Sequence, residues 1–111
     1  MQTIVVEEPF NNWERKPLSA GRIRAISIGP LKLDSTGTAA ASNLYVNFDK
    51  GQAVGAYVFP IAASASSFGG LYFLDQECSG SVWIRTPAGP HAESSITFWF
   101  EGDTLPNGVK L

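Results

Sequence analysis

The chain of 111 residues is poor in the residue types that build cross-links, metal sites and nucleic-acid contacts. Its single cysteine, Cys78, excludes an internal disulfide framework. One cysteine and one histidine cannot supply the usual zinc ligand sets, so we expect no metal site and no cofactor. The eight basic residues are spread along the chain and the net charge is −2. Because no basic arm could neutralise a run of phosphates, we expect no nucleic-acid partner.

Long apolar runs and helical periodicity are also missing. No stretch reaches the length of a transmembrane helix, and the opening MQTIVVEEPF carries two glutamates and no positive region. We therefore expect no export signal and no membrane association, and a protein made in a cytoplasm. No window shows apolar residues sustained at three-and-four spacing, which argues against helices.

Short strands separated by turn residues are what the sequence contains. Alternating apolar and polar residues predict strands at 3–7, 21–28, 43–48, 53–59, 71–76, 81–86 and 94–101, with an eighth in the tail. A change of phase between Ala25 and Ile26 predicts a β-bulge. Turns at 49–52 and 77–80 predict two hairpins. We expect one domain over 1–111, an all-β antiparallel β-sandwich that is jelly-roll-like or immunoglobulin-like, with seven or eight short strands.

Candidate catalytic groups are few. If 71–86 is a hairpin, Cys78 and His91 lie at opposite ends of the strand 81–86, about 20 Å apart at ~3.3 Å per residue. That separation disfavours a Cys–His dyad. Two carboxylate pairs occur near strand ends: Asp75 with Glu77, and Glu101 with Asp103. We interpret these as solubilising charges rather than as glycosidase or calcium-binding groups, and predict that the protein is not an enzyme.

Three aromatic residues fall on strand faces that otherwise look polar. Trp99 alternates with Phe98 and Phe100, which share the expected core face. Trp83 points away from the core by the same alternation, and Tyr45 falls among asparagines. Either the chain covers these rings itself, with the N-terminal segment, the tail or an edge loop, or they form a contact surface for a partner. If the last two strands are neighbours, the two tryptophans share one sheet surface.

The N-terminal segment has two interpretations. Residues 1–17 could form an extended arm in which Ile4, Val5 and Val6 add to the sheet of a neighbour, or they could form a terminal strand of their own sandwich. Edge strands of a sandwich need protection, and a second copy would supply it. We therefore expect a homo-oligomer, with a dimer as the simplest form.

In overall form the chain resembles the small β-rich decoration proteins of tailed-bacteriophage heads, especially the jelly-roll staples on heads of the epsilon15 type. The resemblance covers the chain length, the short strands, the unpaired cysteine, the Ala/Ser/Thr-rich loops 35–42 and 62–67, and the segment 1–17. It implies a structural protein on the outer surface of a virion that bridges capsomers by binding the major capsid protein. It assigns no individual residue.

A carbohydrate-binding module is the alternative. Exposed tryptophan and tyrosine rings on a sandwich face can stack on sugar rings, and Trp99, Trp83 and Tyr45 would then be the binding residues. Such modules are usually exported, and the opening of this chain shows no signal for export. A generic oligomeric scaffold is a third class that the sequence leaves open.

Overall fold

A computed structural model describes residues 1–6, 12–30, 42–61, 68–86 and 94–111 of the chain. Within these residues the backbone forms eight strands and no helix, so no helix there could cross a membrane. The strands are β1 (Gln2–Val6), β2 (Glu14–Pro17), β3 (Gly21–Pro30), β4 (Ser42–Asn47), β5 (Tyr57–Ile61), β6 (Phe68–Cys78), β7 (Ser81–Arg85) and β8 (Ser94–Phe100).

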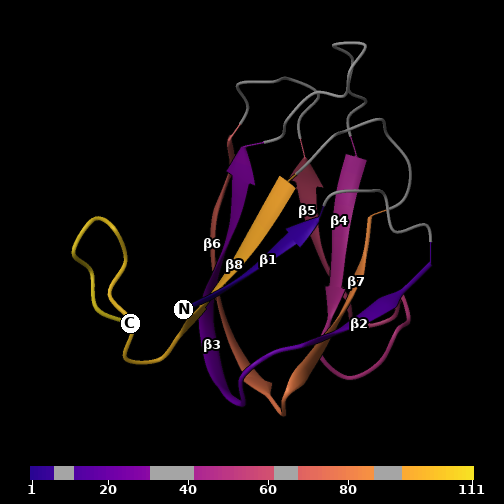
Figure 1. Cartoon of the computed structure of the whole chain (residues 1–111), viewed down its shortest axis with the longest axis horizontal. Helices are drawn as coiled ribbons and strands as arrows, with labels where there is room; N and C mark the ends of the chain where they lie inside the picture. Colours follow the sequence, from indigo (N-terminus) through magenta and orange to yellow (C-terminus); the bar gives the residue numbers. More distant parts are fainter. Residues whose placement is uncertain (7–11, 31–41, 62–67, 87–93) are drawn as a thin grey trace.

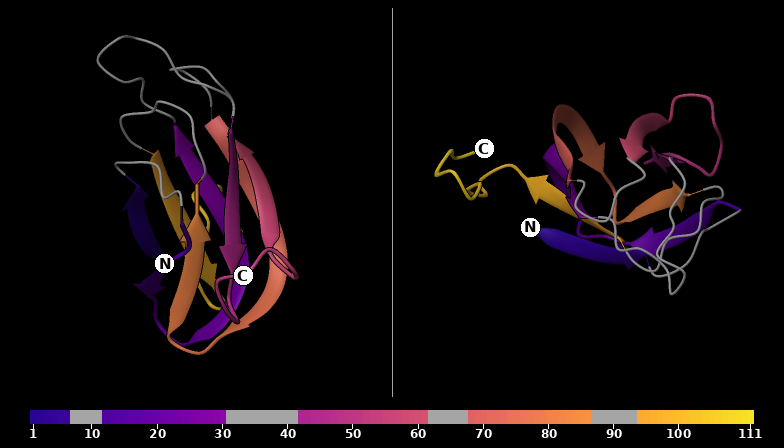
Figure 2. Two further views of the ribbon diagram at one scale, coloured as in Figure 1. Left: turned by 90° about the vertical axis from the view of Figure 1, so that its right-hand side faces the viewer. Right: turned by 90° about the horizontal axis from the view of Figure 1, so that it is seen from above.

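The strands form two antiparallel sheets of four, in the orders β1-β8-β3-β6 and β2-β7-β4-β5. Figure 1 shows the first sheet on the left and the second on the right, and Figure 2 shows them from the side and from above. Strand β1 pairs with β8, β2 with β7, β3 with β6 and β4 with β5, so the first strand pairs with the last and the pairs are nested inward along the chain. This nested pairing is that of a jelly roll. The predicted all-β sandwich is confirmed, and the strand order selects the jelly roll over the immunoglobulin-like alternative.

The core lies between the sheets and follows the alternation of each strand. Phe98 of β8 is fully buried, and its ring meets that of Phe48 edge to face, with centroids 6.0 Å apart. Val82 and Ile84 of β7 are fully buried as well, while Trp83 between them faces outward and is partly exposed. The inward-facing residues from both sheets therefore form one apolar layer.

The predicted bulge is present in β3, slightly earlier than the sequence pattern placed it. The register of β3 against both of its neighbours shifts between Ile23 and Ala25. The core-facing side chains are Ile23 and Ile26, which are both fully buried. The extra residue turns Ala25 to the outer face, where it packs against Trp99.

The predicted hairpin over 71–86 is wrong. Strand β6 begins at Phe68, three residues before the predicted strand 71–76, and pairs with β3, while β7 pairs with β2 and β4 in the other sheet. The link at Ser79 and Gly80 is therefore a corner between sheets. A second corner, from β2 to β3, lies beside it, because the Leu18 N–H donates a hydrogen bond to the Gly80 carbonyl over 3.0 Å.

The hairpin formed by β4 and β5 is confirmed, but its turn is longer than predicted. Pairing ends at Val46 with Tyr57, so the connection is wider than residues 49–52. The second strand was predicted to end at residue 59, yet Pro60 lies inside β5 opposite Asn43. Proline is tolerated there because β5 is an edge strand, whose outward side has no partner strand within the described residues.

The N-terminal segment is not a detached arm in this structure. Strand β1 pairs along its length with β8, and β2 pairs with β7, so the segment supplies one strand to each sheet. Val6 is fully buried in the core and Ile4 packs against it, whereas Val5 is exposed on the outer face. Burial of the inward pair favours the terminal-strand interpretation over strand exchange.

Candidate contact surfaces

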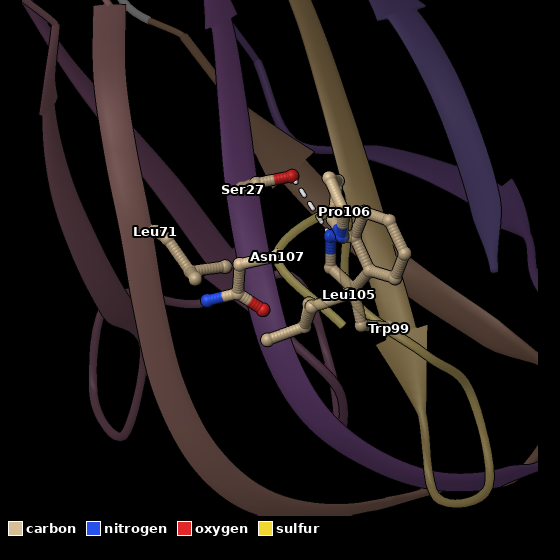
Figure 3. A pocket seen from close by; sticks show the side chains of 6 residues that line it. All are labelled: Ser27, Leu71, Trp99, Leu105, Pro106 and Asn107. Atoms are coloured by element: carbon tan, nitrogen blue, oxygen red, sulfur yellow. Dashed lines mark hydrogen bonds between the residues drawn. The ribbon is translucent and has the colours of Figure 1, made fainter. Parts of the chain in front are cut away.

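Trp99 is covered by its own chain, and of the two interpretations of its ring the structure therefore favours cover by the tail over an exposed contact surface. The residue is 8% exposed and forms a small second core with Ala25, Leu105 and Leu111. Its indole Nε1–H donates a hydrogen bond to the Ser27 hydroxyl over 2.9 Å (Figure 3). The polar tip and the apolar ring of this side chain are both satisfied within the monomer.

The cover over Trp99 is a small C-terminal hairpin. A turn at Asn107-Gly108 closes it, with Gly108 at a φ of 88° and the Leu105 N–H bonded to the Val109 carbonyl. At the start of this hairpin the Asp103 carboxylate lies 2.8 Å from the N-terminal ammonium nitrogen and accepts a hydrogen bond from the Phe100 N–H. The ammonium and this N–H hold the pKa of Asp103 below its usual value.

Trp83 and Trp99 lie on opposite outer faces of the sandwich. The prediction that they could share a surface is wrong, because β7 and β8 belong to different sheets. On the outer face of β2-β7-β4-β5, Trp83 lies instead near Tyr45 and Trp13. The rings of Trp13 and Tyr45 meet edge to face with centroids 6.4 Å apart, and the Arg85 guanidinium carbon lies 5.6 Å from the Tyr45 centroid. We call Trp13, Tyr45, Trp83, Arg85 and Arg15, which pairs with Trp83 across β2 and β7, the aromatic platform.

One end of the platform is shaped by the loop after β4. Asn47 is buried, and its side-chain amide donates to the carbonyls of Gln52 and Val54 over 2.9 and 3.2 Å. Its amide oxygen accepts from the N–H groups of Asp49 and Lys50. This side chain is therefore fully used in holding the loop.

The held loop brings the backbone of Gly51 against the two tryptophans. A Cβ added at Gly51 would lie 2.8 Å from Trp13 Cβ and 2.9 Å from Trp83 Cε3. Glycine is thus needed here for close approach, although its φ is not positive. All three aromatic residues of the platform remain partly exposed after this contact.

Substituting Gly51 tests this packing. A Gly51→Ala variant should lose about 1–3 kcal/mol of unfolding free energy, because the new methyl group displaces an indole ring. Its tryptophan emission should also shift. Gly55→Ala is the control, since Gly55 has a φ of +80° with nothing within 4 Å of a Cβ. That variant should lose stability through backbone strain with unchanged emission. An unchanged emission spectrum in Gly51→Ala would contradict the contact.

Two arginines make the platform basic although the chain is acidic overall. Arg85 pairs with Tyr45 across β7 and β4, and the exposed Arg15 pairs with Trp83 across β2 and β7. Arg15 also lines a shallow hollow of about 240 Å³ with Pro17, Gly80 and Ser81. Guanidinium groups beside aromatic rings suit carboxylates, hydroxyl groups and carbonyl oxygens of a partner.

A second surface lies on the outer face of the other sheet. A groove of about 230 Å³ is lined by Ser27, Leu71, Trp99, Leu105, Pro106 and Asn107 (Figure 3). Its lining is mainly apolar. Leu71 lies on β6, where Phe73 follows on the same outer face and is 66% exposed. Two exposed apolar residues of this sheet, Leu71 and Phe73, therefore lie on the edge strand β6, while the exposed Val5 lies on the opposite edge strand β1.

The structure describes only some of the remaining chemical candidates. Cys78 is buried, with its sulfur 3.6 Å from the Ser81 carbonyl oxygen, while His91 and residues 31–41, 62–67 and 87–93 lie outside the described residues. Asp75 is bound by Arg22 over 2.7 Å. Among the described residues no three histidine, cysteine or carboxylate side chains gather in a way that could hold a metal ion.

The predicted contact residues thus separate into different places. Tyr45 and Trp83 come together on the platform, Trp99 lies under the tail on the far sheet, and Ile4 and Val6 face the core. Sequence reasoning missed Trp13, because it stands in the polar stretch NNWERKP without strand alternation around it. Its only signal was the presence of a large aromatic residue in such a stretch.

Comparisons of the chain with protein-family models, curated proteins and solved structures found no match.

Proposed function

We propose that the protein is a non-catalytic structural protein that works by surface contact, with the aromatic platform as its contact surface. The observation that supports this most is the presence of three partly exposed aromatic rings and two arginines on one outer sheet face. Aromatic residues and arginine are the types enriched at the anchors of protein interfaces. The inward side chains of this sheet form the core, and the platform residues lie on its outer face. A partner could therefore bind the platform without any strand unfolding.

The particular role that we propose is decoration or stapling of a bacteriophage capsid, with the major capsid protein as partner. The jelly roll and the chain length support it by their resemblance to the head decoration proteins. The platform would face an acidic or carbonyl-rich patch of the capsid. Its two arginines would bind there, while Trp83 and Tyr45 would be removed from water.

The test is the composition of purified particles from the virus that carries this gene. We expect the protein in a fixed ratio to the major capsid protein, and particles lacking it should release their genome at a lower temperature. Absence of the protein from purified particles would contradict the proposed role.

A charge reversal identifies the bound face. Arg15→Glu should weaken binding to particles by about 2 kcal/mol or more if the platform anchors the contact. Lys110→Glu makes the same change in net charge at an exposed position on the tail and should bind as the parent protein does. Equal losses in the two variants would indicate a net-charge effect and contradict the use of this face.

Carbohydrate binding is the second candidate, and the same platform favours it. Partly exposed rings with a neighbouring guanidinium group can stack on a sugar and bind its hydroxyl groups. Titration with a panel of glycans should then shift tryptophan emission in the parent protein and not in Trp83→Ala. A flat response across the panel would contradict this candidate.

A further inference from the structure

We propose that the free edge of β6 (Phe68–Cys78) pairs antiparallel with β6 of a second copy, joining two β1-β8-β3-β6 sheets into one. This places an interface at a defined strand and register, on the side of the molecule away from the aromatic platform. It goes beyond the proposed function and does not require it.

The four edge strands of the sandwich differ in how they are protected. β2 has the sequence ERKP, so charged residues and proline protect it, and β5 contains Pro60. β1 is short, and its Gln2 side chain accepts from the Ser19 N–H over 2.9 Å, which ties this edge to the corner between β2 and β3.

β6 is less protected: its charged residues, Asp75 and Glu77, lie toward its C-terminal end, where its register against β3 also shifts between Phe73 and Gln76. It is the longest described strand, with 11 residues, and the sequence FGGLYFLDQEC contains no proline, lysine or arginine. Its one partner strand is β3, so the N–H and C=O groups on its other side face no strand within the described residues. Its outward Leu71 and Phe73 are 38% and 66% exposed. A long, exposed and apolar edge is a site for strand pairing.

The side-chain pattern of β6 selects a second copy and one register. In an antiparallel pair centred on Tyr72, Leu71 lies directly opposite Phe73 of the other copy, and Asp75 lies opposite Gly69. Apolar residues then meet apolar residues, and each acidic end meets an uncharged end. A parallel pair in register would instead set Asp75 and Glu77 beside their own copies, which like-charge repulsion disfavours. The strand is therefore self-complementary in the antiparallel sense that a two-fold dimer requires.

The groove beside Trp99 extends this interface. Leu71 forms one of its walls, with Leu105 and Pro106 of the tail lining it as well. Phe73 of the second copy, placed opposite Leu71, would cover the outer rim of that wall and bury apolar surface that is exposed in the monomer.

The two-fold axis of such a pair runs perpendicular to the joined sheet. Both copies therefore turn the same face outward, and their two aromatic platforms point in one direction. A dimer of this geometry could hold two sites on one surface at once, as a bridging protein must.

The oligomeric state of the full chain tests the pairing. Light scattering after size exclusion, from about 10 μM to 1 mM, should show a dimer of the parent protein. Phe73→Glu should raise the dimer dissociation constant by about 30-fold or more. Val5→Glu is the matched control, since Val5 is 49% exposed on β1, the opposite edge strand of the same sheet, and it should leave the dimer unchanged. A monomeric parent protein, or equal effects of both substitutions, would overturn the proposal.

Disulfide trapping tests the register. Directly opposed residues of an antiparallel pair have Cα atoms about 4.5–5.5 Å apart, within disulfide range. Under oxidation the double variant Leu71→Cys, Phe73→Cys should form covalent dimers, whereas Phe73→Cys alone and the parent protein, whose Cys78 is buried, should not. Equal trapping by Phe73→Cys alone would overturn this register.

The β6 pairing and the proposed capsid role can fail independently of each other. A monomer that binds particles through Arg15 would overturn the β6 pairing and leave the capsid role intact. A protein that dimerises through β6 but is absent from particles would support the pairing and contradict the capsid role.

Discussion

Replacing Trp99 with alanine is expected to lower the free energy of unfolding by about 3–5 kcal/mol and to release the C-terminal hairpin. The indole is the centre of the small core formed with Ala25, Leu105 and Leu111, and its Nε1–H is bonded to Ser27. Its removal leaves a cavity on the outer face and deprives the tail of the surface on which it packs. Denaturant unfolding gives the loss, and hydrogen exchange at the Leu105 and Leu111 amides shows the release.

The neighbouring tail position supplies the control. Val109 is exposed in the same hairpin, so Val109→Ala should change stability by no more than about 0.5 kcal/mol. If Trp99→Ala cost less than about 1 kcal/mol, or if tail amides exchanged at the same rate in the variant, the tail would not depend on this ring.

Replacing Phe98 with alanine is expected to cost a similar amount, about 3–5 kcal/mol, with a different distribution through the molecule. Phe98 is fully buried between the sheets and meets edge to face the ring of Phe48, which directly follows β4 of the opposite sheet. The cavity would therefore weaken the contact between sheets. In Phe98→Ala, hydrogen exchange of backbone amides should accelerate in strands of both sheets. In Trp99→Ala, it should accelerate first in the C-terminal hairpin.

Thr97 on the same strand is the control for Phe98. It faces outward, and its hydroxyl shares a hydrogen bond of 2.9 Å with that of Thr3. Thr97→Ala should cost at most about 1 kcal/mol, since that bond is accessible to water. A loss for Thr97→Ala as large as that for Phe98→Ala would mean that the two faces of β8 had been assigned the wrong way round.

The alternation of apolar and polar residues along single strands predicted the fold class, because in a sandwich every second residue of a strand is buried. In the predicted strand 43–48, Leu44, Val46 and Phe48 alternate with polar or outward residues, and all three are buried. The phase change near Ala25 likewise signalled a real bulge. Local pattern and tertiary burial agree wherever a strand has one face on the core and the other toward solvent.

Pairing between strands could not be read in the same way. The link at Ser79-Gly80 is short enough for a hairpin, yet here it turns a corner between sheets. A glycine-containing link of two residues fits both geometries, and the choice depends on which partner strands bury the two apolar faces. That information is distributed over β2, β3 and β4, which are distant in sequence.

The candidate site was predictable only in part for the same reason. Tyr45 and Trp83 were found because each breaks the alternation of a clear strand, whereas Trp13 precedes its strand and shows no such break. Trp99 broke the alternation too, but its cover is a tail that has the composition of a surface loop. Whether an outward aromatic residue is left exposed depends on loops and termini, whose path is not encoded in strand periodicity.

The most direct test of the platform is hydroxyl-radical footprinting of the protein free and bound to purified particles. Aromatic side chains that are accessible in the free protein are labelled, and mass spectrometry locates the labels. We expect labelling of Tyr45 and Trp83 to fall strongly on binding, while Trp99 is labelled weakly in both states because its own chain covers it. Unchanged labelling of Tyr45 and Trp83 in the bound protein would contradict the role of the platform as the contact surface.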